Sequence, residues 1–185
     1  DRTIMSGGTH PKIGIVTAGK SYLDTRQALD ELGINEVRAN ELGLRLYKVA
    51  MTWPLEPEGI EKFAQGLDLI LVIEEKRALV ETQVKEQLFD WPLRPQVLGK
   101  RNEGVNYLLP AKGALKPLDI AIAVGERILG ATSDGRLATR LHHLKTLKDD
   151  LPVHMSAIHT PHYIYAGCPH SSSTVIPDRA RAYAG

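Results

Sequence analysis

Short apolar runs alternate with helix-like segments through the first 130 residues of the chain. The runs Lys12–Thr17, Leu44–Ala50 and Leu69–Ile73 have the length and the apolar content of buried strands. A fourth and shorter strand is predicted at Gln96–Leu98. Because Leu69–Ile73 (LILVI) is apolar at every position, both of its faces should be covered, as in a parallel sheet between layers of helices.

Segments with helical signals separate the predicted strands. The first helix should be capped by Ser21, with Asp24 completing a motif close to a capping box, and should end at Gly33. Further helices are predicted at Glu36–Leu42, from Pro57 to just before Gly66, at Ala78–Leu88, and at Pro117–Leu129 with Leu118, Ile122 and Leu129 facing inward. Strands separated in this way specify a three-layer α/β/α sandwich with a mostly parallel sheet.

The pattern divides the chain into three parts. Residues 1–11 are polar and glycine-rich, and they are expected to be a leader or linker. Residues 12–150 are expected to form the α/β domain, which ends in a charged helix between residues 131 and 150. Residues 151–185 contain little that could form a core, and they are expected to be a linker that leads into a further domain.

Composition and charge narrow the classes of function. The chain has 185 residues, with 23 Lys and Arg against 22 Asp and Glu, so its formal net charge is +1. This near-neutrality argues against binding to nucleic acid or to an anionic membrane surface. A single cysteine excludes an intrachain disulfide, an all-cysteine zinc site and a cysteine-ligated iron–sulfur cluster held by this chain alone, and it fits a cytoplasmic protein. The longest mostly apolar run, residues 67–73, is much shorter than the roughly 20 residues that span a bilayer.

One nucleotide-binding motif is matched literally. Residues 14–21 (GIVTAGKS) satisfy the phosphate-loop pattern GxxxxGK[ST]. In a genuine phosphate loop the first glycine follows the strand, whereas here only two residues of the predicted strand precede Gly14, and β-branched residues would have to form the loop. A buried strand that turns into a helix is therefore the preferred interpretation, with a small P-loop phosphotransferase as the alternative. Gly19, Lys20 and Ser21 still stand at a helix N-terminus and are a candidate anion site.

Histidines gather late in the chain and could ligate a metal. Cys168 and His170 could supply two zinc ligands, and His159 and His162 two more. No pair among them has a reliable helical spacing, so linker or solvent-exposed histidines are the preferred interpretation, and no metal site is predicted.

A charged run follows the most apolar strand. Glu74, Glu75, Lys76 and Arg77 would stand at the carboxyl end of this strand, the edge at which ligands bind in open α/β sheets. A solvated charge cluster at the start of a helix, with acids near the positive end of the helix dipole, is the preferred interpretation.

Four segments carry a resemblance to a known family. In chain order they are residues 14–34 (GIVTAGKSYLDTRQALDELGI), 51–77 (MTWPLEPEGIEKFAQGLDLILVIEEKR), 95–100 (PQVLGK) and 167–177 (GCPHSSSTVIP). The chain resembles the indolepyruvate ferredoxin oxidoreductase family over roughly residues 11–185. More narrowly, it resembles the long fused bacterial members that join both subunit types in one chain.

The resemblance implies a thiamine diphosphate enzyme that oxidises aryl and other 2-oxoacids. Thiamine diphosphate, Mg and 4Fe-4S clusters would be cofactors of the full enzyme, with coenzyme A and ferredoxin as its partners. Residues 11–130 would be similar to the C-terminal domain of transketolase, which usually holds no cofactor and helps assembly. The remaining domains of the same enzyme would then pack against this one, which could also form a homo-oligomer.

The GCPHSSST segment resembles the start of the domain that grips the diphosphate end of the cofactor. By this resemblance, the residues that approach thiamine diphosphate are Cys168, His170, Ser171, Ser172, Ser173 and Thr174. No catalytic residue is predicted, because the glutamate-bearing domain should precede residue 1 and the metal-binding part of the cofactor domain should follow Gly185.

The chain departs from the family at two points. Tyr165 and Ala166 replace the first two residues of the family's Cys-Ser-Gly-Cys-Pro-His, and Asp178-Arg179-Ala180 stands in place of Glu-Gly-Ser. Together with the missing initiator methionine, the resemblance leads us to expect a structural and assembly fragment of a longer enzyme. Such a fragment would hold no cofactor alone and would have no thiamine turnover by itself.

Overall fold

A computed structural model describes residues 1–104 and 106–150, and residues 1–150 form one compact unit. The predicted linker and cofactor-domain start, residues 151–185, lie outside the described residues.

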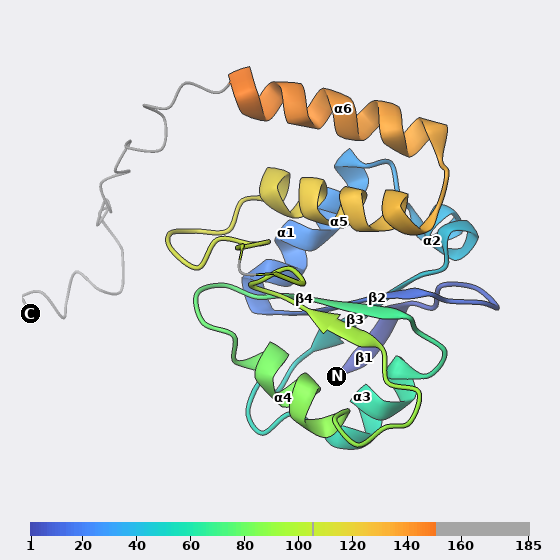
Figure 1. Ribbon diagram of the computed structural model, residues 1–185, viewed down its shortest axis with the longest axis vertical. Coiled ribbons are helices and arrows are strands. Elements are labelled where there is room, and N and C mark those ends of the chain that lie inside the picture. The colour runs from blue at the N-terminus through green and yellow to red at the C-terminus, as the bar shows by residue number, and fades with distance from the viewer. Residues whose placement is uncertain (105, 151–185) are drawn as a thin grey trace, which may run out of the picture. The chain divides into compact units, whose positions relative to one another are not determined.

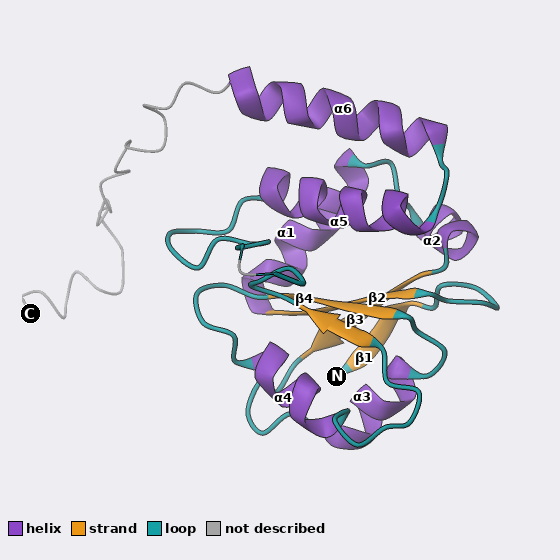
Figure 2. Ribbon diagram, viewed as in Figure 1, coloured by secondary structure: helices purple, strands orange, loops and turns teal. Residues whose placement is uncertain are grey.

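A five-stranded sheet lies at the centre of this unit (Figures 1 and 2). Its strands are β1 (Arg2–Met5), β2 (Ile13–Ala18), β3 (Leu44–Val49), β4 (Leu69–Ile73) and β5 (Gln96–Leu98). They are ordered β1-β3-β2-β4-β5, and all neighbours are parallel except β1, which pairs antiparallel with β3. The mostly parallel sheet expected from the sequence is therefore confirmed, with one antiparallel strand added at its edge.

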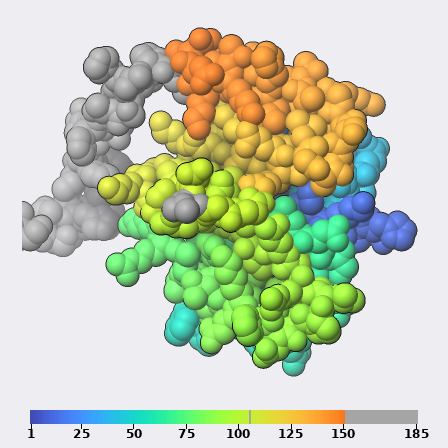
Figure 3. All heavy atoms as spheres, in the orientation of Figure 1, coloured from blue at the N-terminus to red at the C-terminus, as the bar shows by residue number. Residues whose placement is uncertain are grey.

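Helices cover both faces of the sheet, as Figure 2 shows. The helices are α1 (Gly19–Glu31), α2 (Glu36–Leu42), α3 (Pro57–Ala64), α4 (Val80–Gln87), α5 (Pro117–Ala131) and α6 (Gly135–Asp150). Helices α3 and α4 lie on one face, and α1, α2 and α5 lie on the other (Figure 1). This is the predicted three-layer α/β/α sandwich, to which α6 adds an outer helix that packs on α5. In the space-filling view, α5 and α6 form a continuous yellow and orange cover above the green part of the unit (Figure 3).

Alternate residues of each central strand enter different cores. In β4, Leu71 and Ile73 belong to the core beneath α1 and α5, whereas Ile70 and Val72 belong to the core beneath α3 and α4. Side chains of a strand alternate between the two faces of a sheet, so a strand covered on both sides must be apolar throughout. The LILVI sequence is explained by this double burial.

The prediction that residues 1–11 are a leader is wrong for Arg2–Met5, which form β1. Met5 is buried in the core, and Thr3 lies opposite Tyr47 of β3. The Asp1 carboxylate also accepts a hydrogen bond of 2.6 Å from the Ala50 N–H. The polar residues of this segment face solvent because β1 is an edge strand, which hides the strand pattern in the sequence.

The predicted cap of the first helix is also wrong. Helix α1 begins at Gly19, directly after β2, and its N-cap residue Ala18 makes no side-chain cap. Gly19 has a φ of +54°, a left-handed conformation that favours glycine, so the chain turns from strand to helix without a linker. Ser21 consequently lies inside the first turn and is buried.

Helix α5 buries a broader surface than the one predicted. Leu118, Ile122 and Leu129 do pack against the core, but they are only partly buried. The fully buried stripe comprises Ile120, Ala121, Ala123, Val124, Gly125 and Ile128. A helix packed between α1 on one side and α6 on the other buries a wider surface than one apolar stripe indicates.

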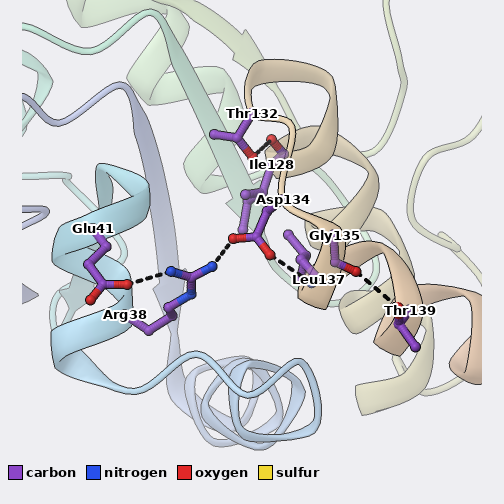
Figure 4. A network of polar contacts seen from close by, with 8 residues as sticks. All are labelled: Arg38, Glu41, Ile128, Thr132, Asp134, Gly135, Leu137 and Thr139. Carbon is purple, nitrogen blue, oxygen red and sulfur yellow. Dashed lines mark hydrogen bonds and ion pairs between the residues drawn. The ribbon is translucent and has the colours of Figure 1, made fainter.

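A polar junction joins α2 to the start of α6 (Figure 4). Arg38 of α2 forms ion pairs with Glu41 of its own helix and with Asp134. Asp134 immediately precedes α6, and its carboxylate accepts the Leu137 N–H at 2.9 Å. One carboxylate thus satisfies a backbone donor of α6 and holds that end of the helix against α2.

Replacing Gly14 with alanine should destabilise the fold. The added Cβ would lie 2.5 Å from Leu67 Cδ1 and 2.8 Å from Phe63 Cζ. Overpacking of this kind typically costs about 1–3 kcal/mol of unfolding free energy, which urea denaturation measures. The matched control is Gly130→Ala in α5, where no atom lies within 4 Å of the new Cβ and the stability should rise by about 0.5–1 kcal/mol. A Gly14→Ala protein as stable as the wild type would contradict the packing of α3 on β2.

Candidate functional site

The carboxyl ends of the four parallel strands meet at one edge of the sheet. Gly19 follows β2, Glu74 follows β4, and Gly99 with Lys100 follows β5. In open α/β sheets this edge is where ligands bind. The polar residues at this edge are therefore the candidate functional site.

The Glu74 carboxylate caps helix α4. It is buried, and it accepts hydrogen bonds from the backbone N–H groups of Leu79, Val80 and Glu81 at 3.0, 2.9 and 3.0 Å. The N–H groups of Val80 and Glu81 lie in the first turn and have no partner within the helix. The N-cap residue Leu79, whose N–H also donates to the Arg77 carbonyl oxygen at 3.0 Å, supplies no side-chain acceptor of its own. The prediction of a solvated charge at this position is wrong for Glu74.

Lys100 and Glu81 extend this buried network toward β5. The Lys100 ammonium donates to the backbone carbonyl oxygen of Glu74, and to that of Pro110 at 3.3 Å. The Lys100 N–H donates to Glu81 Oε2 at 2.9 Å, and Glu81 Oε1 accepts from Lys85 Nζ at 2.6 Å. The loop after β5 is therefore fastened both to the end of β4 and to helix α4.

Burial lowers the pKa of Lys100 below its ordinary value of 10.5, and the negative charges of Glu74, Glu81 and Glu75 oppose this effect. Removal from water disfavours the charged ammonium, whereas nearby carboxylates favour it. Gly99 lets the chain approach Glu81 closely, because a Cβ there would lie 2.3 Å from Glu81 Oε2.

Gln83 ties the proline-rich loop after β3 to helix α4. Its amide oxygen accepts the Leu55 N–H at 2.8 Å, and its amide nitrogen donates to the carbonyl oxygens of Thr52 and Leu79. Gln83 is itself buried. The buried polar groups of Glu74, Glu81 and Gln83 thus bind loops and helix ends together.

The candidate anion site of Gly19, Lys20 and Ser21 borders a hollow of about 230 Å³ that Glu74 and Glu75 also line. Lys20 Nζ lies 2.5 Å from Asp24 Oδ2 and 3.7 Å from Glu75 Oε1. The hydrogen bond to Asp24 raises the pKa of Lys20. This lysine already has carboxylate partners, which weighs against an anion here, and the site stays a prediction.

The phosphate-loop interpretation is wrong. Gly14 and the three residues after it belong to β2 and pair with β3 on one side and β4 on the other. Their backbone N–H groups are extended and take part in the sheet, so they do not curl around a phosphate. Because these residues form a strand, the alternative of a small P-loop phosphotransferase is wrong as well.

The remaining predicted site residues lie outside the described residues. They are the candidate zinc ligands His159 and His162, together with Cys168, His170, Ser171, Ser172, Ser173 and Thr174. Within the described part of the chain, no group of three or more His, Cys, Asp and Glu side chains could hold a metal ion. In the same residues, no helix is long and apolar enough to cross a membrane.

Lys100, Glu81 and Gln83 were not predicted from the sequence. Glu81 and Gln83 look like exposed polar positions of an amphipathic helix, and a lysine after a three-residue strand has no local signal of burial. The one sequence signal for a buried polar group here is the Gly99-Lys100 pair. It follows the carboxyl end of a strand, and that strand is the neighbour of the one that ends before Glu74.

The mostly parallel sheet and the helices on its two faces define a three-layer α/β domain. Buried hydrogen bonds hold the carboxyl edge of its sheet together. The sequence model of the family described as "Indolepyruvate oxidoreductase domain" matches residues 3–150, which is most of the chain. The chain belongs to this family. The resemblance to the indolepyruvate ferredoxin oxidoreductase family is thereby confirmed, whereas the likeness to its fused bacterial members and the part of the resemblance after residue 150 stay predictions.

Curated relatives agree with the family match. The indolepyruvate oxidoreductase subunit IorA of Pyrococcus abyssi is 34% identical over 96 residues, which cover 52% of this chain and 14% of the relative. The same subunit of Pyrococcus horikoshii is also 34% identical over 96 residues, with the same coverage. The match thus spans only about a seventh of the length of these relatives.

Two solved structures match part of the chain. One is described as an inactive beta4 tetramer of a split-gene transketolase, with 19% identity and a TM-score of 0.43 over 69% of this chain and 41% of its own. The other is 2-oxoglutarate:ferredoxin oxidoreductase from Magnetococcus marinus, with 18% identity and a TM-score of 0.44 over 69% of this chain and 19% of its own. The fold assignment rests on the sheet and helices described above.

Replacing Glu74 with alanine should lower the free energy of unfolding by about 1–3 kcal/mol, because the N–H groups of Val80 and Glu81 in the first turn of α4 lose their acceptor. Glu75→Ala is the matched control: this carboxylate forms a 3.7 Å ion pair with the exposed Lys20 and is the weakest of the three negative charges that act on Lys100, so its loss should change stability by less than about 0.5 kcal/mol. Chemical denaturation of both variants measures the difference. Equal effects of the two substitutions would show that Glu74 is not a structural cap.

Lys100 should make stability depend on alkaline pH. Its pKa is lower in the folded protein than in the unfolded chain, so the unfolded chain binds more protons between the lowered pKa and about 10.5. In that window the contribution of Lys100 to stability rises with pH, and below it the contribution is constant. The unfolding free energy of wild type minus that of Lys100→Met should therefore increase as pH approaches 10.5. A difference that stays flat or falls would contradict the burial of an ionisable lysine.

Proposed function

We propose that the chain is a structural and assembly domain, similar to the C-terminal domain of transketolase, in a thiamine diphosphate-dependent indolepyruvate:ferredoxin oxidoreductase. The full enzyme would work in the cytoplasm, decarboxylate a 2-oxoacid oxidatively and form an acyl-coenzyme A. The supporting observation is the family match across residues 3–150, which coincides with the compact unit of the described structure.

The buried polar groups at the carboxyl edge support a structural role. Glu74, Glu81, Gln83 and Lys100 use their hydrogen bonds to fasten loops and the start of α4. A residue that acts as a general acid or base must instead come within hydrogen-bonding reach of a proton on the bound substrate. The IorA relatives are also much longer than the matched segment, which leaves room for catalytic domains elsewhere in the enzyme.

We expect the cofactors to be bound by parts of the enzyme other than the described domain. Cys168, His170 and the run Ser171, Ser172, Ser173 and Thr174 would approach the diphosphate of thiamine diphosphate, and they lie outside the described residues. Bound there, the cofactor would stabilise the carbanion left by decarboxylation. Mg, 4Fe-4S clusters, coenzyme A and ferredoxin would be engaged by the remaining domains, so no reaction step is assigned to a described side chain.

Turnover by the purified chain and complementation test this proposal. With indolepyruvate, thiamine diphosphate, Mg²⁺, coenzyme A and a one-electron dye, the 185-residue chain alone should reduce no dye above the blank without thiamine. Added to an enzyme from which the same domain has been deleted, the folded chain should restore dye reduction. Thiamine-dependent turnover by the chain alone would contradict the structural role.

The Glu74→Ala protein serves as a control for the complementation. At a temperature at which it remains folded, it should restore activity as well as the wild type, because the residue acts within the domain. A folded Glu74→Ala chain that fails to restore activity would instead place this residue in the chemistry of the complete enzyme.

A further inference from the structure

A cationic pocket of about 550 Å³ lies beside the carboxyl ends of β4 and β5. It is lined by Lys76, Arg77, Lys100 and Arg101, together with Tyr107 and two alanines. Among the described residues that line it, none is acidic. Four positive side chains around one hollow are conspicuous in a chain whose formal net charge is only +1.

The turn after β4 separates its acids from its bases. Glu74 is directed to the N–H groups of α4, and Glu75 is directed to Lys20. Lys76 and Arg77 are exposed, and no carboxylate among the described residues lies within 4.0 Å of either side-chain charge. Lys76 also has a φ of +56°, a conformation that non-glycine residues rarely adopt. The turn therefore presents two cations to the pocket while the acids of the same run face elsewhere.

The opposite wall is held in place by the protein. The Lys100 ammonium is fixed by the carbonyl oxygens of Glu74 and Pro110. The Arg101 guanidinium lies 4.6 Å from the centre of the Tyr107 ring, and the backbones of these two residues form an isolated antiparallel bridge. An incoming anion would thus meet two positioned cations on this wall and two exposed cationic side chains on the other.

We propose that this pocket binds a small phosphorylated molecule through its phosphate group. Phosphate has several peripheral oxygens that can be shared among Arg and Lys donors, and arginine binds them with paired N–H groups. The volume lies within the 300–1,000 Å³ that is typical of small-molecule sites. A row of acidic side chains on a partner protein would instead need an extended basic surface. Phosphate binding in this pocket does not depend on the structural role proposed for the domain.

Calorimetric titration of the full 185-residue chain with inorganic pyrophosphate, and separately with AMP, tests the proposal. Saturable binding of one molecule per chain is expected for both probes. Arg77→Ala and Lys76→Gly should each weaken pyrophosphate binding by roughly tenfold or more, because each removes one charge-assisted contact. Lys76→Gly also relieves the left-handed backbone, so the variant should fold at least as well as the wild type.

Lys20→Ala and a glutamate hexapeptide are the controls. Lys20 belongs to the other candidate anion site, where Asp24 and Glu75 already pair with its charge, so its loss should change the pyrophosphate affinity by no more than about twofold. The proposal is overturned by three results: no saturable binding of either probe, binding that is lost in Lys20→Ala but kept in Arg77→Ala, or hexapeptide binding as tight as that of pyrophosphate.

Discussion

The buried bonds of Glu74 hold together the carboxyl edge of this domain. The side chain of this residue closes the first turn of α4, and its backbone carbonyl accepts the ammonium of Lys100 from the loop after β5. A charged group survives burial only when its partners replace water, so the carboxylate, the helix end and the lysine depend on one another. One residue at the end of the central apolar strand therefore positions both the following helix and the neighbouring loop, including the wall of the cationic pocket.

The layered architecture could be predicted from the sequence because its signals are local. LILVI, the Glu36–Leu42 segment and Pro57 each fix an element without reference to distant residues, and the structure has β4, α2 and the start of α3 at those positions. Strand β1 could not be found in this way, because its polar residues form a strand only through pairing with Leu44–Val49. The buried stripe of α5 likewise depends on α6, which lies later in the chain.

The candidate site was less accessible to sequence reasoning than the fold. The EEKR run was correctly placed at a strand's carboxyl end, yet its four residues divide between two environments: Glu74 is buried, whereas Lys76 and Arg77 are exposed. This division depends on which side of the turn faces α4. Lys100 is brought to Glu74 only because β5 pairs with β4, a neighbour relation that sequence spacing does not show.

Strand β1 also protects the domain from pairing with copies of itself. It satisfies the outer backbone groups of β3, whose residues Leu44, Leu46 and Val49 are fully buried. Shortening the chain by its first five residues would uncover that row of hydrogen-bonding groups and leave β3 as an open, apolar border, the kind of border on which chains add to one another and aggregate. The few residues that look dispensable in the sequence thus govern whether the protein stays dispersed at high concentration.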